Sequence, residues 1–281
     1  MAITAPSTSG TAPGSPDPGA PGRATVTHTV THTGTAFTRW LGVATLVSMA
    51  LVAAFGFFFS PPDVVQGESV RMLYIHVGTI WVAYIAFILT AIMSAGVLWK
   101  GRTSLTLDRI AGASAEIGVV FMALTLLAGA LWGRISWGKF WVWDARVTTT
   151  AFLFITYVGY LAVRELGGSH QQRARRSAVV ALLAVLEIPL VHFSVKLWRS
   201  VHQDASVADR TSDVTLDGLM LFTLVLSLVA FSLLFLWWVL HRQRVLAMED
   251  ALEDRGLDLA LVERRREAEL DAQRVARGGT A

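Results

Sequence analysis

The sequence contains no cysteine among its 281 residues. This absence excludes structural disulfides, thiolate metal sites, a cysteine nucleophile and thioether attachment of a cofactor to this chain. Charged residues are also scarce, at 16%, whereas 53% of the chain is hydrophobic, which is too apolar for an ordinary soluble domain of this size. The formal net charge is only +3, with the basic residues mostly in short loops and the C-terminal tail. We therefore expect a membrane-embedded protein and no nucleic-acid partner.

Large apolar residues are nearly absent from residues 1–36, which are instead rich in Pro, Gly, Ser, Thr and Ala. Such a segment cannot bury enough surface to fold, so we predict a disordered N-terminal tail over 1–36. The segment also lacks the apolar core of a cleavable signal peptide. The first hydrophobic run, which begins near Trp40, is therefore expected to serve as an uncleaved membrane anchor.

Six apolar runs follow, and each is long enough to cross a bilayer core as a helix. We predict an all-α polytopic membrane protein, a bundle of six transmembrane helices. The connections after the second and fourth runs are basic, as is the segment after the sixth, so these ends are expected to face the cytoplasm. This topology places both termini on the cytoplasmic side of the membrane. The predicted spans lie near residues 39–59, 72–99, 111–131, 148–163, 177–197 and 217–240.

Three regions follow from this organisation: the tail (1–36), a six-helix membrane domain (37–245) and a charged cytoplasmic C-terminal segment (246–281). From about His241 to Ala276 the sequence mixes Glu, Arg, Leu and Ala without a Gly-Pro break, which predicts a helix. Its pattern favours a solvated helix over a docking surface for a partner subunit.

The stretch Gly133 to Lys139 matches part of a phosphate-binding loop. The motif fails on physical grounds, because Phe140 stands where the magnesium-binding Ser or Thr is required and no strand precedes it. The predicted topology also places it outside, away from ATP. If transport consumes ATP, another chain must hydrolyse it.

The loop between the third and fourth spans is dense in aromatic residues beside charge. Its tryptophans suit either of two roles: stacking on a flat conjugated ligand, or the ordinary position of tryptophan at the level of lipid headgroups. A headgroup belt needs only one or two such residues at each helix end and does not call for Gly, Asp and cations among them. We therefore keep both roles open. The aromatic residues are Trp132, Trp137, Phe140, Trp141 and Trp143.

Two of the seven histidines, His76 and His192, lie inside apolar spans, where an ionisable residue indicates a functional site. His76 comes five residues after Arg71 on an inward-running span, and His192 comes four residues before Lys196 on an outward-running one. At about 1.5 Å per residue, both imidazoles lie some 6 to 8 Å below the outer charged boundary. Pro189 removes a helix hydrogen bond and is expected to bend the span that carries His192.

Two neutral imidazoles at one level, below an aromatic loop and cations, suit haem. The iron takes axial nitrogen ligands, the porphyrin packs on aromatic rings, and the propionates pair with cations. Arg71 and Arg146 are the candidates for the propionates, and Asp144 is expected to orient either arginine. The alternative for these three residues is contact with lipid headgroups. His202 is on the correct side, but its depth is not constrained, and we assign it only a supporting role behind the ligands.

The stretch "WGKFWVWDARVTT" resembles the tryptophan-rich signature of the CcmC family, the haem-handling membrane proteins of cytochrome c maturation. "SVRMLYIHV" and "IPLVHFSVKLW", with "VHQ" after it, resemble the two histidine segments of that family, and the match runs from about residue 37 to 245. The resemblance implies non-covalent binding of haem b at the outer face, with His76 and His192 as axial ligands of the iron. The implied site comprises His76, His192, Arg71, Trp132, Trp137, Gly138, Trp141, Trp143, Asp144 and Arg146.

The resemblance further implies that haem passes to the chaperone CcmE, alongside the ABC-type subunits CcmA and CcmB and the small protein CcmD. We expect a carrier that presents haem rather than an enzyme with bond-making residues of its own. Two alternatives stay open. A quinol-linked cytochrome b subunit would also use paired histidines, and a structural subunit of an ABC exporter would need none in its spans.

Overall fold

The computed structural model describes residues 34–99, 104–202, 216 and 218–278. The predicted disordered tail lies almost wholly outside these residues. Within them, six helical segments are long and apolar enough to cross a membrane, which confirms the predicted all-α architecture of a multi-pass membrane protein. The spans are Ala36–Phe59, Glu68–Trp99, Leu105–Trp137, Ala145–Glu165, His170–Leu197 and Gly218–Val275.

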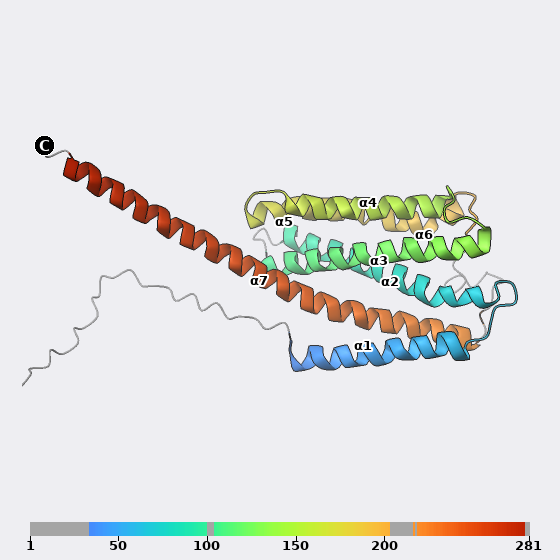
Figure 1. Ribbon diagram of the computed structural model, residues 1–281. Coiled ribbons are helices and arrows are strands. Elements are labelled where there is room, and N and C mark those ends of the chain that lie inside the picture. The colour runs from blue at the N-terminus through green and yellow to red at the C-terminus, as the bar shows by residue number, and fades with distance from the viewer. Residues whose placement is uncertain (1–33, 100–103, 203–215, 217, 279–281) are drawn as a thin grey trace, which may run out of the picture. The chain divides into compact units, whose positions relative to one another are not determined.

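Several of these spans contain more than one helical element, as Figure 1 shows. A short π-helical turn extends the first span, and a 3-10 turn precedes the second. The elements are α1 (Ala36–Ala54), η1 (Phe55–Phe59), η2 (Glu68–Arg71), α2 (Met72–Trp99), α3 (Leu105–Trp137), α4 (Ala145–Glu165), α5 (His170–Ala184), α6 (Glu187–Leu197) and α7 (Gly218–Gly278).

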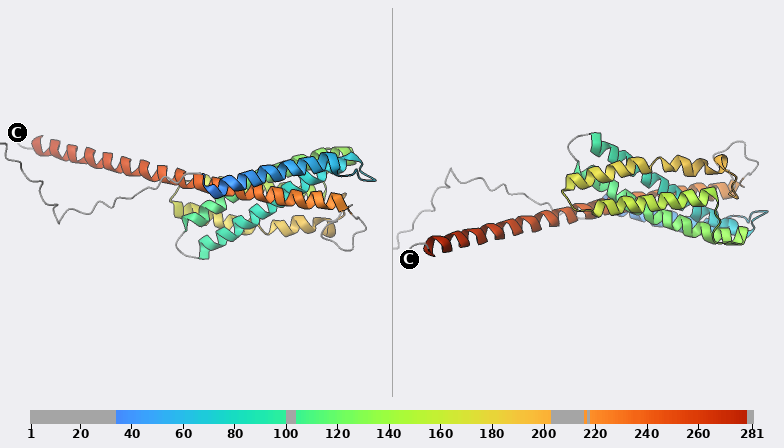
Figure 2. Two further views of the ribbon diagram at one scale, coloured as in Figure 1. Left: turned by 90° about the horizontal axis from the view of Figure 1, so that it is seen from below. Right: turned by 90° about the horizontal axis from the view of Figure 1, so that it is seen from above.

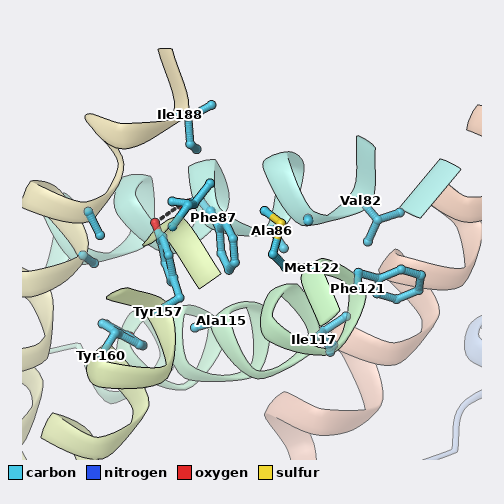
Figure 3. Packing of buried hydrophobic residues seen from close by; sticks show 14 of the residues in the cluster. Val82, Ala86, Phe87, Ala115, Ile117, Phe121, Met122, Tyr157, Tyr160 and Ile188 are labelled. Atoms are coloured by element: carbon cyan, nitrogen blue, oxygen red, sulfur yellow. Dashed lines mark hydrogen bonds between the residues drawn. The ribbon is translucent and has the colours of Figure 1, made fainter. Parts of the chain in front are cut away.

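The helices pack into a bundle in which α2 and α3 share the largest interface and α1 lies along α7 (Figure 2). Gly118 on α3 allows the close approach, because an added Cβ would lie 2.5 Å from Cε1 of Phe87 on α2. Phe87 in turn stacks on Tyr157 of α4 with ring centroids 3.5 Å apart. The Tyr157 hydroxyl donates a hydrogen bond to the Phe87 carbonyl (3.3 Å; Figure 3). The core therefore joins α2, α3 and α4 around one aromatic pair.

The fifth span is broken into α5 and α6 at Val185 and Leu186. Pro189 has no N–H to donate to the Val185 carbonyl four residues earlier, and that carbonyl accepts from Ile188 instead (3.1 Å). The expected bend before His192 is thus present as an interruption of the helix. One consequence is that the faces of α6 are not continuous with those of α5.

The two ends of the α3 to α4 connection have recognisable stop and start signals. Gly138 follows α3 with a φ of +74°, a left-handed conformation that glycine adopts without steric cost. Asp144 caps α4, and its side chain accepts a hydrogen bond from the backbone N–H of Arg146 (3.0 Å). The aromatic loop is therefore fixed at both ends.

Partly buried ion pairs hold the opposite end of the bundle together. Arg164 of α4 donates to both carboxylate oxygens of Asp108 on α3 (2.7 and 3.0 Å). Arg242 of α7 pairs with Glu116 of α3, and Arg109 donates to Asp250 (2.7 Å). The helix predicted over 241–276 and the sixth span form one element, α7, without a break.

Candidate functional site

His76 lies in the first turns of α2 and packs against α3. A Cβ added at Gly129 would lie 3.0 Å from Cε1 of the imidazole, so the ring occupies space that only glycine leaves open. The indole of Trp132, three residues further along α3, meets the imidazole edge to face with centroids 5.8 Å apart. Nδ1 of His76 is buried and has no hydrogen-bond partner. A buried, unsatisfied imidazole nitrogen is costly unless a ligand takes it.

His202 lies in the segment after α6 and packs against the aromatic loop. Its ring meets the indole of Trp137 with centroids 4.7 Å apart, and its side chain is 21% exposed. Nδ1 lies 3.3 Å from a carboxylate oxygen of Asp144, without the geometry of a hydrogen bond. His76 is close enough to His202 and Arg146 to interact electrostatically with both. His76, His202 and Arg146 thus form one group of neighbouring polar side chains.

Asp144 fastens the segment before His202 to the start of α4. Its carboxylate accepts hydrogen bonds from the Val201 backbone N–H (2.9 Å), the Ser200 hydroxyl (2.9 Å) and the Arg146 backbone N–H (3.0 Å). Burial raises the pKa of this carboxyl, but the three hydrogen bonds outweigh burial and hold the pKa below its usual range. Asp144 therefore acts as a charged acceptor that joins the segment after α6 to the start of α4.

The protonation state of His202 follows from its surroundings. Burial lowers the pKa of its imidazole, the Asp144 carboxylate opposes that change, and the nearby Arg146 guanidinium adds to the lowering. The net pKa is below the usual value of 6.5. The ring is therefore mainly neutral at pH 7, which is the form that ligates a metal.

Of the two arginines predicted to hold propionates, Arg146 belongs to this group and Arg71 has other partners. Arg146 donates from Nη2 to the His192 carbonyl (2.9 Å), and its Nε is buried without a partner. Arg71 instead donates to the Gly56 carbonyl and to Glu68 (2.5 Å), which ties η2 to the end of the first span. Arg146 has a donor to spare for an anion.

His192 is exposed, and its ring meets the neighbouring Phe193 ring with centroids 5.0 Å apart. Its helix, α6, packs mainly against α4. The interactions of the described residues connect His192 to the site through its backbone carbonyl, which accepts from Arg146, rather than through its imidazole. The predicted level of His192 along the bundle does not by itself bring its ring toward His76.

The remaining tryptophans of the loop lie outward of this group. Trp141 and Trp143 meet edge to face with centroids 5.7 Å apart, and Trp143 is 85% exposed. A cavity of about 340 Å³ opens beside Trp143, between the aromatic loop and the segment that follows α6. Its lining consists of Val142, Trp143, Asp144, Arg199, Ser200 and Val201. The cavity is therefore bordered by aromatic surface from the loop and by the Arg199 cation from the segment after α6.

One further cluster resembles a metal site by composition. Ligand atoms of His170, Asp250 and Glu253 lie within 4.8 Å of one another at the other end of the bundle. Asp250 already accepts from Arg109 (2.7 Å) and lies 3.6 Å from Arg173, and Arg173 contacts Nδ1 of His170 (2.7 Å). Two guanidinium groups at these ligand atoms indicate an ion-pair network rather than a metal site.

Sequence reasoning missed three contributors to the site. Gly129 and Gln66 carry no chemical signal in the sequence, because their importance depends on the contacts of His76 and Trp132. Ser200 is likewise an ordinary loop residue until the fold places it beside Asp144. His202 was considered but given a supporting role, although "VHQ" resembles part of a family histidine segment.

The sequence matches a known protein family over most of its length. The sequence model of the family described as Heme exporter protein C matches residues 23–256, which is most of the chain. The chain belongs to the heme exporter protein C family. The predicted membership of the CcmC family is thereby confirmed, and the matched region contains every residue of the site described above.

Individual members of the heme exporter protein C family show the extent of the similarity. Heme exporter protein C of Bradyrhizobium diazoefficiens is 36% identical over 197 residues, which covers 70% of this chain and 73% of that protein. The Escherichia coli K12 protein of the same name is 32% identical over 216 residues, covering 76% and 85% respectively. A putative cytochrome c biosynthesis ccmC-like mitochondrial protein of Arabidopsis thaliana is 35% identical over 164 residues, covering 58% and 60%.

Proposed function

We propose that this protein holds haem as cargo at the outer end of its bundle and presents it for cytochrome c maturation. The observation that carries the proposal is a concentration of unsatisfied nitrogens. Among the described residues, five buried side-chain nitrogen or oxygen atoms have no hydrogen-bond partner, and three of them belong to His76, His202 and Arg146. Native proteins rarely leave such atoms unpaired without a function. A ligand that takes imidazole nitrogens and an anionic group fits all three.

The geometry favours His76 and His202 as the pair that ligates the iron. Both side chains carry an orphaned Nδ1, both pack edge to face on a tryptophan, and both interact electrostatically with Arg146. The pairing of His76 with His192, expected from the sequence, stays a prediction. Alanine variants of the three histidines distinguish the two pairings. Because the chain has no cysteine, haem b would be held without a thioether bond to this protein.

The surroundings supply the other groups that haem requires. Arg146 offers a free Nε–H for a propionate, and the indoles of Trp132 and Trp137 line the polar group on two sides. Trp141 and Trp143 extend the aromatic surface outward, where one porphyrin edge can stay accessible to an acceptor. Asp144 contributes by holding the His202 segment rather than by contacting haem.

The protein that accepts the haem and the companion subunits are inferred from membership of the family. We propose that haem passes to the chaperone CcmE with the help of the ABC-type subunits CcmA and CcmB and the small protein CcmD. The chain itself would act as a presenter, in which transfer is a proximity effect. The relatives' printed names, which refer to heme export and cytochrome c biosynthesis, support this assignment.

The proposed orientation puts the site outside the inner membrane and both termini in the cytoplasm. Arg109, Arg164, Arg173 and Arg242 gather at the end of the bundle opposite the tryptophan loop. Basic residues favour the cytoplasmic side, so their grouping at one end supports this orientation. A cysteine-accessibility scan with single cysteines at Trp143 and Arg175 in intact cells would test it. A membrane-impermeant thiol reagent should label only the first, whereas labelling of only the second would overturn the orientation.

The haem content of the purified protein tests the main proposal. We expect the wild-type protein to retain haem and Arg146→Ala to retain less, while the variant Arg71→Ala keeps most of it because Arg71 bonds to Gly56 and Glu68. A haem-free wild-type protein, which also fails to take up added haem, would contradict the proposal. The cytochrome b alternative predicts reduction of the bound haem by quinol, and a redox titration distinguishes it from a presenter.

A further inference from the structure

Trp132, which covers one side of His76, is itself held by a residue from a different part of the chain. Its indole N–H donates a hydrogen bond of 3.0 Å to the side-chain oxygen of Gln66. Gln66 lies in the segment between η1 and η2, and Trp132 lies near the outer end of α3. A loop after the first span thus reaches the wall of the His76 site through one amide side chain.

Gln66 is held in place by the turn that contains it. The Asp63 carboxylate accepts from the backbone N–H groups of Gln66 (2.7 Å) and Val65 (2.8 Å). The backbones of Asp63 and Gly67 pair in both directions (3.1 and 2.9 Å). Gly67 has a φ of +56°, in the left-handed region that favours glycine. This closed turn presents the Gln66 side chain at a defined position, so the hydrogen bond to Trp132 costs little additional ordering.

Gly129 and Trp132 both contact the His76 ring, and we call the space that they bound the His76 socket. The ring atoms of His76 nearest to its virtual Cβ are Cε1 at 3.0 Å and Nδ1 at 3.5 Å, so a methyl group there would push the imidazole away from α3. Gly129 and Trp132 are three residues apart and therefore lie on one face of α3. Together they fix both the depth and the tilt of the ring.

We propose that Gln66 and Gly129 are positioning residues for His76: Gln66 acts through Trp132, and Gly129 acts by direct contact. The proposal extends the function proposed above, because it concerns how the ligand imidazole is aimed. The contacts that carry the proposal are all within this chain, so they can be tested without haem.

The test measures the reaction of His76 with diethyl pyrocarbonate in the haem-free protein, with modified peptides quantified by mass spectrometry. Gln66→Leu removes the acceptor, and we expect His76 to react about fivefold faster, which corresponds to about 1 kcal/mol for one hydrogen bond. Gln66→Glu keeps an oxygen acceptor for the indole N–H and should react like wild type. The rate at His170, at the other end of the bundle, reports in the same molecules that the fold is intact.

A matched pair of glycine variants tests the second wall. Gly129→Ala should raise the reaction rate of His76, whereas Gly159→Ala, whose added Cβ would meet nothing within 4 Å, should not. Both substitutions are made inside a membrane-spanning helix, so they share any general effect of alanine on the helix. Equal His76 rates in the two variants, or an unchanged rate in Gln66→Leu, would overturn the positioning role.

The haem-bound protein separates this inference from the function on which it rests. If His76 is an iron ligand, Gln66→Leu and Gly129→Ala should also change the low-spin electron paramagnetic resonance signal of bound ferric haem, and Gln66→Glu should restore it. Altered His76 reactivity in variants whose haem signal is unchanged would support the socket and contradict the ligand assignment. Unaltered reactivity with a changed haem signal would contradict the socket alone.

Discussion

Removing the Asp144 carboxylate should release the His202 segment and weaken haem binding without unfolding the bundle. In Asp144→Ala, three hydrogen bonds to a charged acceptor are lost, from Arg146, Ser200 and Val201. Only the Ser200 and Val201 bonds hold the His202 segment to Asp144, and at about 1.5 kcal/mol each, the lower end of the range for charged acceptors, their loss costs about 3 kcal/mol. That change lowers the equilibrium constant for the fastened segment on the order of a hundredfold.

Graded variants of the same contact make the reasoning quantitative. Asp144→Asn keeps one carbonyl-type acceptor and should cost about 2 kcal/mol, or roughly a thirtyfold loss of haem affinity. Ser200→Ala removes one of the three bonds and should cost about 1 kcal/mol. The assay is titration of haem-free protein with haemin, followed by absorption, with thermal unfolding of the helices as the control for folding. Wild-type haem affinity in Asp144→Ala would refute the idea that this residue fastens the ligand segment.

Three further predictions concern pH, packing and the ion pairs. Because the folded pKa of Asp144 lies below its usual 3.8, its stabilisation is present above about pH 4 and is lost as the pH falls through the folded value. The protection factor of the Val201 amide against hydrogen exchange, which takes account of the slower intrinsic exchange in acid, should therefore fall as the pH falls, and this change should be absent in Asp144→Asn. Gly118→Ala should destabilise the bundle by about 1–3 kcal/mol, because its Cβ would lie 2.5 Å from a core ring; thermal unfolding equal to that of Gly159→Ala would contradict this. Asp250→Asn removes one of the ion pairs between α7 and α3 and should raise protease cleavage of the C-terminal part of α7 about fivefold, or about 1 kcal/mol; unchanged cleavage would show that the pair contributes nothing.

Six spans could be predicted from the sequence because bilayer thickness sets a minimum apolar length that each run meets. The break in the fifth span could be placed only near Pro189, since the proline predicts a lost hydrogen bond but not whether the helix bends or stops. The continuity of α7 could be predicted because the sequence around His241 contains no helix-breaking residue. Local signals were therefore sufficient for the spans.

The site was less accessible to sequence reasoning, because it is made by contacts between distant segments. Residue spacing gave the depth of His76 and His192, but the direction in which a side chain points depends on the rotation of its helix. For α6 that rotation is reset by the break at Val185 and Leu186. The place of His202 depends on hydrogen bonds from its own segment to Asp144, 56 and 57 residues away in sequence. The tryptophan loop was identified in advance because its composition is unusual over a short stretch.

The most direct test is electron paramagnetic resonance of ferric haem bound to the wild-type protein and to His76→Ala, His202→Ala and His192→Ala. We expect a low-spin signal typical of two imidazole ligands in the wild type and in His192→Ala. In His76→Ala and His202→Ala that signal should be lost, and added imidazole should restore it. A wild-type signal in His202→Ala together with its loss in His192→Ala would contradict the pairing of His76 with His202, and a wild-type signal in His76→Ala would contradict the account as a whole.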